Sequence, residues 1–317
     1  MSDYPLVSII TPSYNQAAFL EQTIQSVLQQ EYPNLEYWVI DGASTDGSVE
    51  IIKKYAGSLA GWVSEKDQGQ AHAINKGFEL AHGEVIAWLN SDDLYKPDAV
   101  SSAVKALQVH PEAGMVFTDV ESIDAHGEAF NLMHYGDWGL HDLMTFHIIG
   151  QPAVFMRRSV LEQAGHLDLS YKYLLDHHLW LRMGLHADIQ YMPNQVWAAA
   201  RMHPGAKNVS QTQGFGIEAY HLVKWMMEAP AFLPHIHQRS KQIWAGAHRL
   251  NAFYLLDGSQ PAQALKAYWR AFWQYPPAVF KDWRRILYAA FAPLGFQGLK
   301  KNYLERRKAR YQHKDEL

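Results

Sequence analysis

Four polar segments contain most of the side chains that could do chemistry together in this chain: TPSYN (11–15), DGAST (41–45), SEKDQGQ (64–70) and NSDD (90–93). Each segment follows an apolar run, and three of the four contain aspartate. A loop that only reverses the chain usually carries one turn signal, whereas polar residues after successive strands are typical of a binding crevice. We therefore expect the four segments to form one ligand site.

The acidic pair Asp92–Asp93 comes directly after one of these apolar runs. Neither the glycine-rich dinucleotide fingerprint nor the phosphate-binding loop of NTPases occurs in the sequence, so a bound diphosphate would need another partner. A divalent cation that bridges carboxylate and phosphate oxygens would serve. The alternative is that an aspartate here only caps the next helix. On these two residues alone, both interpretations stay open.

The elements that must position these loops follow from the hydrophobic periodicity. Short runs rich in β-branched residues predict strands, and apolar residues three or four apart predict the helices between them. The expected strands span residues 6–11, 36–40, 61–64, 84–89 and 115–119. This alternation predicts an α/β fold with a mostly parallel central sheet and helices on both faces. In such sheets ligands bind beyond the carboxyl ends of the strands.

The second half of the chain is less regular. A strand is expected at 152–157, a short helix at 158–164 and a longer helix at 173–186. Beyond residue 216 the sequence favours helices rich in aromatic residues, with a clear amphipathic helix at 262–273. We therefore expect two domains, an α/β domain over residues 1–215 and a helical C-terminal region over residues 216–317.

The composition excludes several classes of protein. With 48% hydrophobic and 19% charged residues, the chain of 317 residues can bury a sizeable core. The absence of cysteine excludes disulfides, thiolate zinc sites and cysteine nucleophiles. A net charge of −4 does not favour a nucleic-acid partner. The first residues, MSDYPLVSII, lack the features of a signal peptide, and we expect a cytoplasmic protein.

Several spaced motifs occur together in one order: VSIITPSYNQ, LEYWVIDGASTDGS, WVSEKDQGQAHAINKG and GEVIAWLNSDD. This series resembles the inverting family-2 glycosyltransferases with the Rossmann-like GT-A fold, of the type found in bacterial polysaccharide biosynthesis. The similarity is dense over residues 6–98 and looser to about residue 210. It implies a metal-assisted hexosyltransferase of the cell envelope, which moves a sugar from a UDP-, GDP- or dTDP-sugar to a glycan or lipid-linked acceptor. It also implies Mg²⁺ or Mn²⁺ as cofactor.

The resemblance assigns roles to residues of the first two polar segments. Pro12 and Tyr14 match the loop that packs against the nucleotide base and ribose. Asp41 matches the aspartate that accepts a hydrogen bond from the base, and Ser44 belongs to the same element. Asp46 completes that element or only caps the following helix.

The later segments match the sugar and metal positions. Asp67 and Gln70 are expected near the ribose and the donor sugar. In the acidic motif, Asp93 is the expected metal ligand and Asp92 is expected to face the ribose or sugar. His203 is a candidate third metal ligand or a contact of the diphosphate.

An inverting transfer needs one general base, which takes the proton of the attacking acceptor hydroxyl. The segment YKYLLDHHLWLRMG (171–184) places Asp176 at the family's base position, although Leu175 replaces the frequent acidic neighbour. An acid on the helix surface is the alternative interpretation. Gln151 is expected on the acceptor side. For Arg157 and Arg158 we weigh phosphate pairing against simple solvation and favour solvation.

Two other function classes are weighed against the transferase. A sugar-1-phosphate nucleotidylyltransferase would need a glycine-rich first loop with Arg or Lys, and TPSYNQ has none. A non-catalytic nucleotide-sugar- or glycan-binding protein on the same fold is the other alternative. The complete set of Asp41, Asp67, Asp93 and Asp176 argues against it.

The C-terminal region combines aromatic and basic residues, since residues 281–317 hold ten Lys or Arg against four Asp or Glu. One interpretation is a helical bundle with a solvated basic end. The other is an interfacial helix pair that contacts anionic lipid at the inner face of the membrane. The terminal KDEL (314–317) is interpreted as a coincidence, because an ER address requires entry to the lumen.

Overall fold

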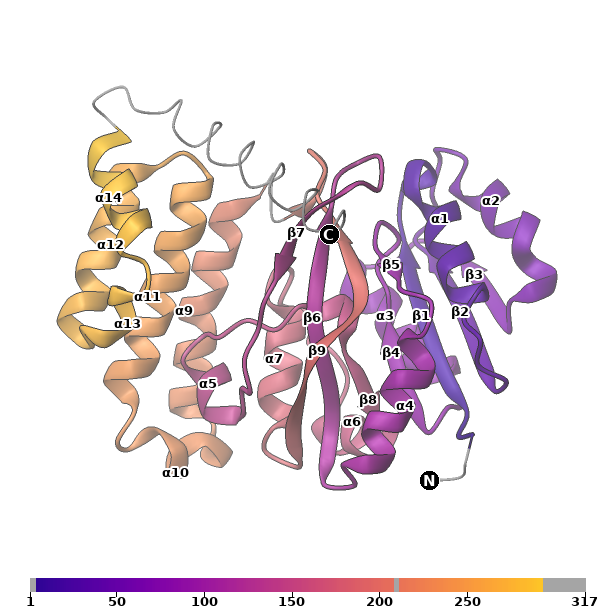
Figure 1. Cartoon of the computed structure of the whole chain (residues 1–317), viewed down its shortest axis with the longest axis horizontal. Coiled ribbons are helices and arrows are strands. Elements are labelled where there is room, and N and C mark those ends of the chain that lie inside the picture. Colours follow the sequence, from indigo (N-terminus) through magenta and orange to yellow (C-terminus); the bar gives the residue numbers. More distant parts are fainter. Residues whose placement is uncertain (1–3, 208–210, 293–317) are drawn as a thin grey trace. The chain divides into compact units, whose positions relative to one another are not determined.

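The computed structural model describes residues 4–207 and 211–292 (Figure 1). The described chain divides into two compact units. The first comprises residues 4–128, 132–140 and 149–201, and the second comprises residues 129–131, 141–148, 202–207 and 211–292. The expected domain boundary after residue 215 stays a prediction. The basic residues from Lys300 onward and the terminal KDEL lie outside the described residues.

The first unit contains a curled mixed sheet with the strand order β3-β2-β1-β4-β8-β6-β9-β5 (Figure 1). Its strands are β1 (Val7–Ser13), β2 (Leu35–Asp41), β3 (Gly61–Ser64), β4 (Val85–Trp88), β5 (Leu94–Tyr95), β6 (Ala113–Ile123), β8 (Phe155–Arg157) and β9 (Asp188–Arg201). Strands β3, β2, β1 and β4 pair in parallel, as do β6 and β9, whereas β8 runs antiparallel to β4 and β6. The expected mostly parallel sheet is confirmed.

Helices cover both faces of this sheet, as the alternation of the sequence predicts. They are α1 (Ala17–Leu28), α2 (Ser48–Tyr55), α3 (Gln70–Leu80), α4 (Ala99–Val109), α6 (Arg158–Ala164) and α7 (Leu175–Met183). Ile9 of β1 shares a buried cluster with Ile24 of α1 on one face. On the other face Gly77 of α3 lies against Ile10, where a Cβ would come within 2.3 Å of that side chain. Alternate residues of a buried strand thus contact helices on opposite sides.

Strand β9 is the one long element that the sequence analysis does not anticipate. It spans 14 residues but contains Pro193 and Asn194, and Asn194 has a positive φ of 60°. Its pairing with β6 changes register between Phe117 and Asp119. Such bulges break the period-two pattern from which a strand is predicted. The strand expected at 152–157 is shorter, because residues 151–153 form a 3₁₀ turn before β8.

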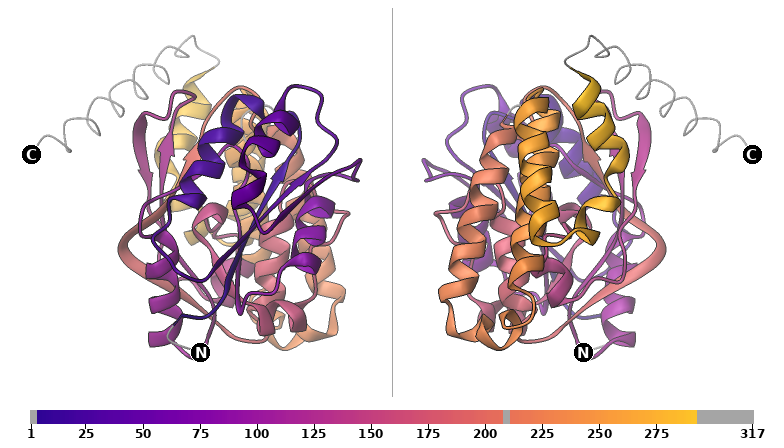
Figure 2. Two further views of the ribbon diagram at one scale, coloured as in Figure 1. Left: turned by 90° about the vertical axis from the view of Figure 1, so that its right-hand side faces the viewer. Right: turned by 90° about the vertical axis from the view of Figure 1, so that its left-hand side faces the viewer.

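The second unit is helical in its described part. Its helices are α9 (Thr212–Glu228), α10 (Leu233–Ile236), α11 (Ser240–Asp257), α12 (Pro261–Gln274), α13 (Pro277–Phe280) and α14 (Trp283–Phe291), while β7 (Ala129–Met133) and α5 (Leu140–Met144) cross the division between the units. Helix α11 packs between α9 and α12 (Figure 2). Among residues 4–207 and 211–292, no helix combines the length and apolar composition that a bilayer span needs.

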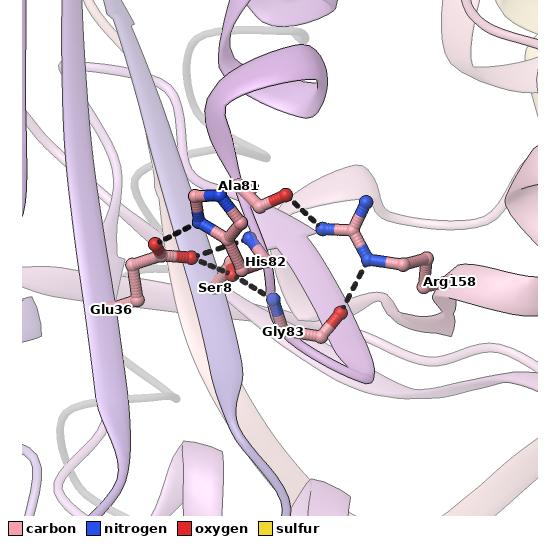
Figure 3. A network of polar contacts seen from close by, with 6 residues as sticks. All are labelled: Ser8, Glu36, Ala81, His82, Gly83 and Arg158. Carbon is pink, nitrogen blue, oxygen red and sulfur yellow. Dashed lines mark hydrogen bonds and ion pairs between the residues drawn. The ribbon is translucent and has the colours of Figure 1, made fainter.

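A polar network fixes the amino end of the sheet, opposite the four polar loops (Figure 3). Glu36 of β2 accepts hydrogen bonds from the Ser8 hydroxyl, from the backbone N–H of His82 (2.7 Å) and from the His82 ring (2.9 Å). Gly83 donates to the Ser8 hydroxyl at 2.7 Å, and its Cα lies so close that a Cβ would be 2.6 Å from the Ser8 nitrogen. The turn between α3 and β4 is therefore held against β1 and β2.

Two arginines complete this end of the unit and correct the expectation that they are solvated. Arg158 donates to the carbonyl oxygens of Ala81 and Gly83, the latter at 2.7 Å. Arg157 donates to the carbonyl oxygens of Leu107 (2.5 Å), His110 (3.2 Å) and Ala113 (2.7 Å). Both guanidinium groups bind backbone carbonyls where helices and strands end. Neither phosphate pairing nor simple solvation, the two interpretations weighed from the sequence, describes these contacts.

We predict that Glu36→Gln lowers the free energy of unfolding by about 1–2 kcal/mol at neutral pH, the size of a hydrogen bond to a charged group. Burial acts to raise the pKa of Glu36, but the hydrogen bonds from Ser8 and His82 outweigh it and lower that pKa. The carboxylate therefore stabilises the folded state above the denatured-state pKa, about 4.3, and this contribution is lost as the pH falls through the folded-state pKa. Urea denaturation between pH 3 and 7 measures it. The exposed Glu50→Gln is the control, and equal stability of both variants at pH 7 would contradict the prediction.

Candidate active site

The four polar segments begin at the carboxyl ends of neighbouring parallel strands, as expected. The register aligns Ser13 of β1 with Asp41 of β2, and Asp41 with Ser64 of β3. The loops after these strands therefore start at one level of the sheet. Strand β4 joins the same edge, because it pairs in parallel with β1 and ends two residues before Asn90.

Asp41 joins the ends of β2 and β3 from inside the protein. Its side chain is only 1% exposed. One carboxylate oxygen accepts the Ser64 hydroxyl at 2.7 Å and the Ser44 N–H at 2.9 Å, and the other accepts the Ser44 hydroxyl. The Ser44 oxygen in turn accepts the backbone N–H of Asn15 at 2.8 Å, which ties in the first loop. Direct contact of Asp41 with a nucleotide base stays a prediction.

Tyr14 presents an exposed ring beside these loops. Its side chain is 62% exposed, whereas Pro12 is buried within β1. A Cβ on Gly42 would lie 2.7 Å from an oxygen of Asp67 and 3.3 Å from the Tyr14 ring, so these side chains approach the same backbone. Asp67 also accepts the N–H of Gly69 at 2.7 Å. An aromatic face next to carboxylates suits a nucleoside, which offers a π-face and hydrogen-bond donors.

Asn90 connects three of the predicted site segments through its side-chain amide. Its oxygen accepts from Gln70 at 2.7 Å, and its nitrogen donates to Asp93 at 3.2 Å and to the Gln151 oxygen at 3.0 Å. Gln151 then donates to the carbonyl of Trp88 at 2.8 Å. The sequence places Asn90 only within NSDD. Its position directly after a strand is the signal that it belongs to the site.

The two carboxylates of the acidic motif have different surroundings. Asp93 is only 6% exposed and accepts the backbone N–H of Arg201 at 2.9 Å, while Asp92 is half-buried. Burial and the neighbouring charge of Asp92 raise the pKa of Asp93 well above its usual value. The Arg201 side chain contributes further contacts that the sequence did not suggest, to the Asp92 carbonyl (2.8 Å) and to Gln22 (2.8 Å). Arg201 therefore binds the motif to the end of β9.

These residues fit a hard divalent cation. Carboxylate and amide oxygens are the ligands that Mg²⁺ and Mn²⁺ prefer. The pKa of Asp93 is raised first by burial and then by the charge of Asp92. Within the described ranges, no cluster of three or more acidic or histidine side chains is arranged to hold a metal. His203 belongs to the second unit, and its role as a ligand stays a prediction.

Helix α7 carries Asp176 and packs on the sheet beside this motif. The ring of Trp180 stacks on that of Trp88 at 5.2 Å between centroids. Residues four apart share a helix face, so Asp176 lies one turn before Trp180 on this side of α7. Its side chain is half-buried in the first helical turn and accepts the N–H of His177 at 2.7 Å. Its role as general base stays a prediction.

Two other residues of this segment are structural. Arg182 donates to the carbonyl oxygens of Ala164 (2.6 Å) and His166 (2.8 Å), where α6 ends. His178 is 3% exposed, its ring lies 4.4 Å from that of Tyr171, and burial lowers its pKa to about 3. The His178–Tyr171 contact holds the first turn of α7, which carries Asp176, and Arg182 binds the last turn to the end of α6.

Comparison with known proteins shows the family of this chain. The family model for glycosyl transferase family 2 matches residues 8–163. A Mycobacterium bovis protein named PGL/p-HBAD biosynthesis glycosyltransferase is 30% identical over 176 residues, which are 54% of this chain and 67% of that one. The chain belongs to glycosyl transferase family 2. It spans 66% of the length of a Bacillus subtilis relative named for teichuronic acid biosynthesis, which is 32% identical over 170 residues.

Solved structures agree on the fold. The S. aureus protein TarS 1–349, solved in complex with UDP-GlcNAc, matches with a TM-score of 0.60 and 16% identity over 88% of this chain and 92% of that one. The mannosyltransferase PcManGT from Pyrobaculum calidifontis, in complex with GDP-Man and Mn²⁺, matches with a TM-score of 0.61 and 22% identity over 96% and 85%. The expected GT-A architecture with a C-terminal helical region is confirmed.

We predict that His178 makes the fold acid-sensitive well above pH 4. The denatured-state pKa is about 6.5 and the folded-state pKa is about 3, so between these values only the denatured state binds the proton. Stability should therefore fall with falling pH, by about 1.4 kcal/mol per pH unit from this residue. Urea denaturation of the wild type and of His178→Phe between pH 4.5 and 6.5 measures the difference in slope. The exposed His126→Phe should keep the wild-type slope, and parallel curves for all three proteins would refute the prediction.

Proposed function

We propose that this protein is an inverting glycosyltransferase that transfers a sugar from a nucleotide-diphosphate sugar, with Asp176 as general base. One observation carries the proposal. Hydrogen bonds connect the Asn90 side chain to Gln70, Asp93 and Gln151. They join the expected donor-sugar, metal and acceptor segments at one edge of the sheet. Family membership supports the transferase class, and the local geometry supports the assignment of the residues.

The donor is proposed to bind along the loops after β1, β2 and β3. The exposed ring of Tyr14 would contact the base, and Asp67 and Gln70 would face the ribose and sugar. Asp41 is the carboxylate expected to accept a hydrogen bond from the base. A carboxylate accepts from an imide N–H, which uracil, thymine and guanine provide. The complexes of TarS with UDP-GlcNAc and of PcManGT with GDP-Man support UDP- and GDP-sugars as the first donors to test.

Mg²⁺ or Mn²⁺ is proposed to bind at the acidic motif, where it would neutralise charge on the departing diphosphate. The structure supports a revision of the two roles expected from the sequence. Asp92 is the more accessible carboxylate and is proposed as the main ligand. Asp93 has its oxygens on the Arg201 N–H and the Asn90 amide, so it would fix the motif and contribute charge. The Mn²⁺ in the PcManGT complex supports this cofactor class.

The proton is proposed to move from the acceptor hydroxyl to a carboxylate oxygen of Asp176 as that hydroxyl attacks the anomeric carbon. Attack opposite the departing diphosphate inverts the anomeric centre, so an α-linked donor would give a β-linked product. The position of Asp176 at the first turn of α7, held by the Trp180–Trp88 stack, supports this assignment.

The acceptor is proposed to be a cell-envelope glycan or its lipid-linked precursor. Relatives named for teichuronic acid, PGL/p-HBAD and O-antigen biosynthesis support this class. Such an acceptor would place the enzyme at the cytoplasmic face of the membrane.

A thermal-shift titration with UDP-, GDP- and dTDP-sugars, each with and without Mn²⁺, tests the donor site. We expect one donor to raise the melting temperature, and more so with Mn²⁺. Asp92→Asn should abolish the metal-dependent part of the shift while the exposed Asp137→Asn retains it. If no donor shifts the melting temperature, or if Asp92→Asn responds like the wild type, the proposed donor and metal sites are wrong.

Asp176→Asn should reduce transfer to a suitable acceptor by roughly 10²-fold or more, because a general base typically contributes 10²–10⁴-fold. Donor affinity should remain within about twofold of the wild type, since the carboxylate is assigned to the acceptor proton. Initial rates and isothermal titration measure the two quantities, with Asp188→Asn, an exposed acid at the start of β9, as control. Retained turnover would exclude Asp176 as the base.

A further inference from the structure

The helices α12, α13 and α14 expose an unusual concentration of large apolar side chains. Six of the thirteen exposed large hydrophobic residues in the described ranges lie here. They form what we call the aromatic face: Trp269 (61%), Trp273 (70%), Phe280 (64%), Trp283 (55%), Leu287 (48%) and Phe291 (50%). Single exposed apolar residues are ordinary, whereas a cluster of this kind marks an interaction surface.

The spacing of these residues places them in a stripe along each of two helices. Trp269 and Trp273 are four residues apart on α12, and Trp283, Leu287 and Phe291 form a stripe with the same spacing on α14. The Trp269 ring lies 5.5 Å from the Trp273 ring.

A hollow of about 450 Å³ runs between the helices of this face. It has an apolar lining that includes residues from all three: Leu265, Tyr268, Trp269, Phe272, Val279 and Ile286. The helices pack through other, smaller residues such as Ala264, Ala271 and Ala289, which form a buried cluster. The aromatic face is therefore additional to the side chains that hold the unit together.

Positive charge surrounds the face. Lys266 and Arg270 on α12, Arg284 on α14 and Lys281 between α13 and α14 are exposed. The single acid between residues 261 and 292 is Asp282, which pairs with Arg249 at 2.9 Å. The guanidinium of Arg284 lies 5.2 Å from the Trp283 ring.

We propose that the aromatic face and these four cations dock the protein on an anionic lipid surface. Tryptophan favours the membrane interface, where its apolar ring is covered and its N–H stays hydrated, and lysine or arginine beside it attracts anionic headgroups. A second copy of the chain is a poorer occupant, because a two-fold contact would bring the four cations against their own kind. The inference does not depend on the proposed transferase reaction.

Co-sedimentation of the full-length protein with phosphatidylglycerol-containing vesicles, and with pure phosphatidylcholine vesicles, tests the proposal. Binding is expected to the anionic vesicles and to weaken as salt rises. Lys281→Gln/Arg284→Gln should weaken binding by roughly tenfold or more, since a cation near an anionic surface contributes about 1 kcal/mol. Trp273→Ala/Trp283→Ala should weaken binding to a similar extent, because it removes two interfacial rings.

The double variant Ile217→Ala/Leu233→Ala is the matched control, because both side chains are exposed in the same unit but outside the face. It should bind vesicles like the wild type, and donor-induced thermal shifts of all variants should match, which shows that they fold. The proposal fails if the wild type does not bind anionic vesicles at low salt, or if the face variants bind equally. It also fails if light scattering shows that the tryptophan variant only converts a dimer to a monomer.

Discussion

The arrangement of the candidate site depends on the side-chain amide of Asn90. A carboxamide is a neutral group with a separate acceptor oxygen and donor nitrogen, and here Asn90 uses both. Its oxygen binds Gln70, and its nitrogen binds Asp93 and Gln151. The start of helix α3, the acidic motif and the turn before β8 are separated by up to 81 residues in the chain. All three bind this single amide, so its hydrogen bonds fix the distances between them.

Buried negative charge at the site is bound by backbone N–H groups together with side-chain donors. Asp41 and Asp93 are both almost fully buried, and each accepts a backbone N–H from another part of the chain or from its own turn. The arginines do the reverse, because Arg157, Arg158 and Arg182 bind carbonyl oxygens where helices and strands end. Buried acids thus collect N–H groups at the carboxyl edge of the sheet. Arg157, Arg158 and Arg182 bind carbonyls away from the loops, whereas the buried Arg201 binds the Asp92 carbonyl within the acidic motif.

The sequence predicted the parts of the fold that depend on local patterns. Strand β3 and helix α6 were both expected at their observed bounds, because β-branched runs and helical spacing are local signals. Strand β9 was missed, since Pro193 and Asn194 interrupt its alternation and its partner β6 lies far away in the sequence. Motif order likewise brought Gln70 and Asp93 to one site. The sequence assigned Asp93 to the metal and Asp92 to the ribose or sugar, but it could not show that Asp93 is the more buried of the two, because its burial and its bond to the Arg201 N–H come from tertiary contacts.

The crowding at Gly42 has a consequence for how this site can diversify. A Cβ there would collide with Asp67 and approach the Tyr14 ring, so this part of the wall is bare backbone. A chain that keeps this geometry has no side chain at position 42 with which to contact a ligand. Under the proposed binding of the donor, changes in preference for the base would have to arise from side chains of the neighbouring loops, such as the exposed Tyr14.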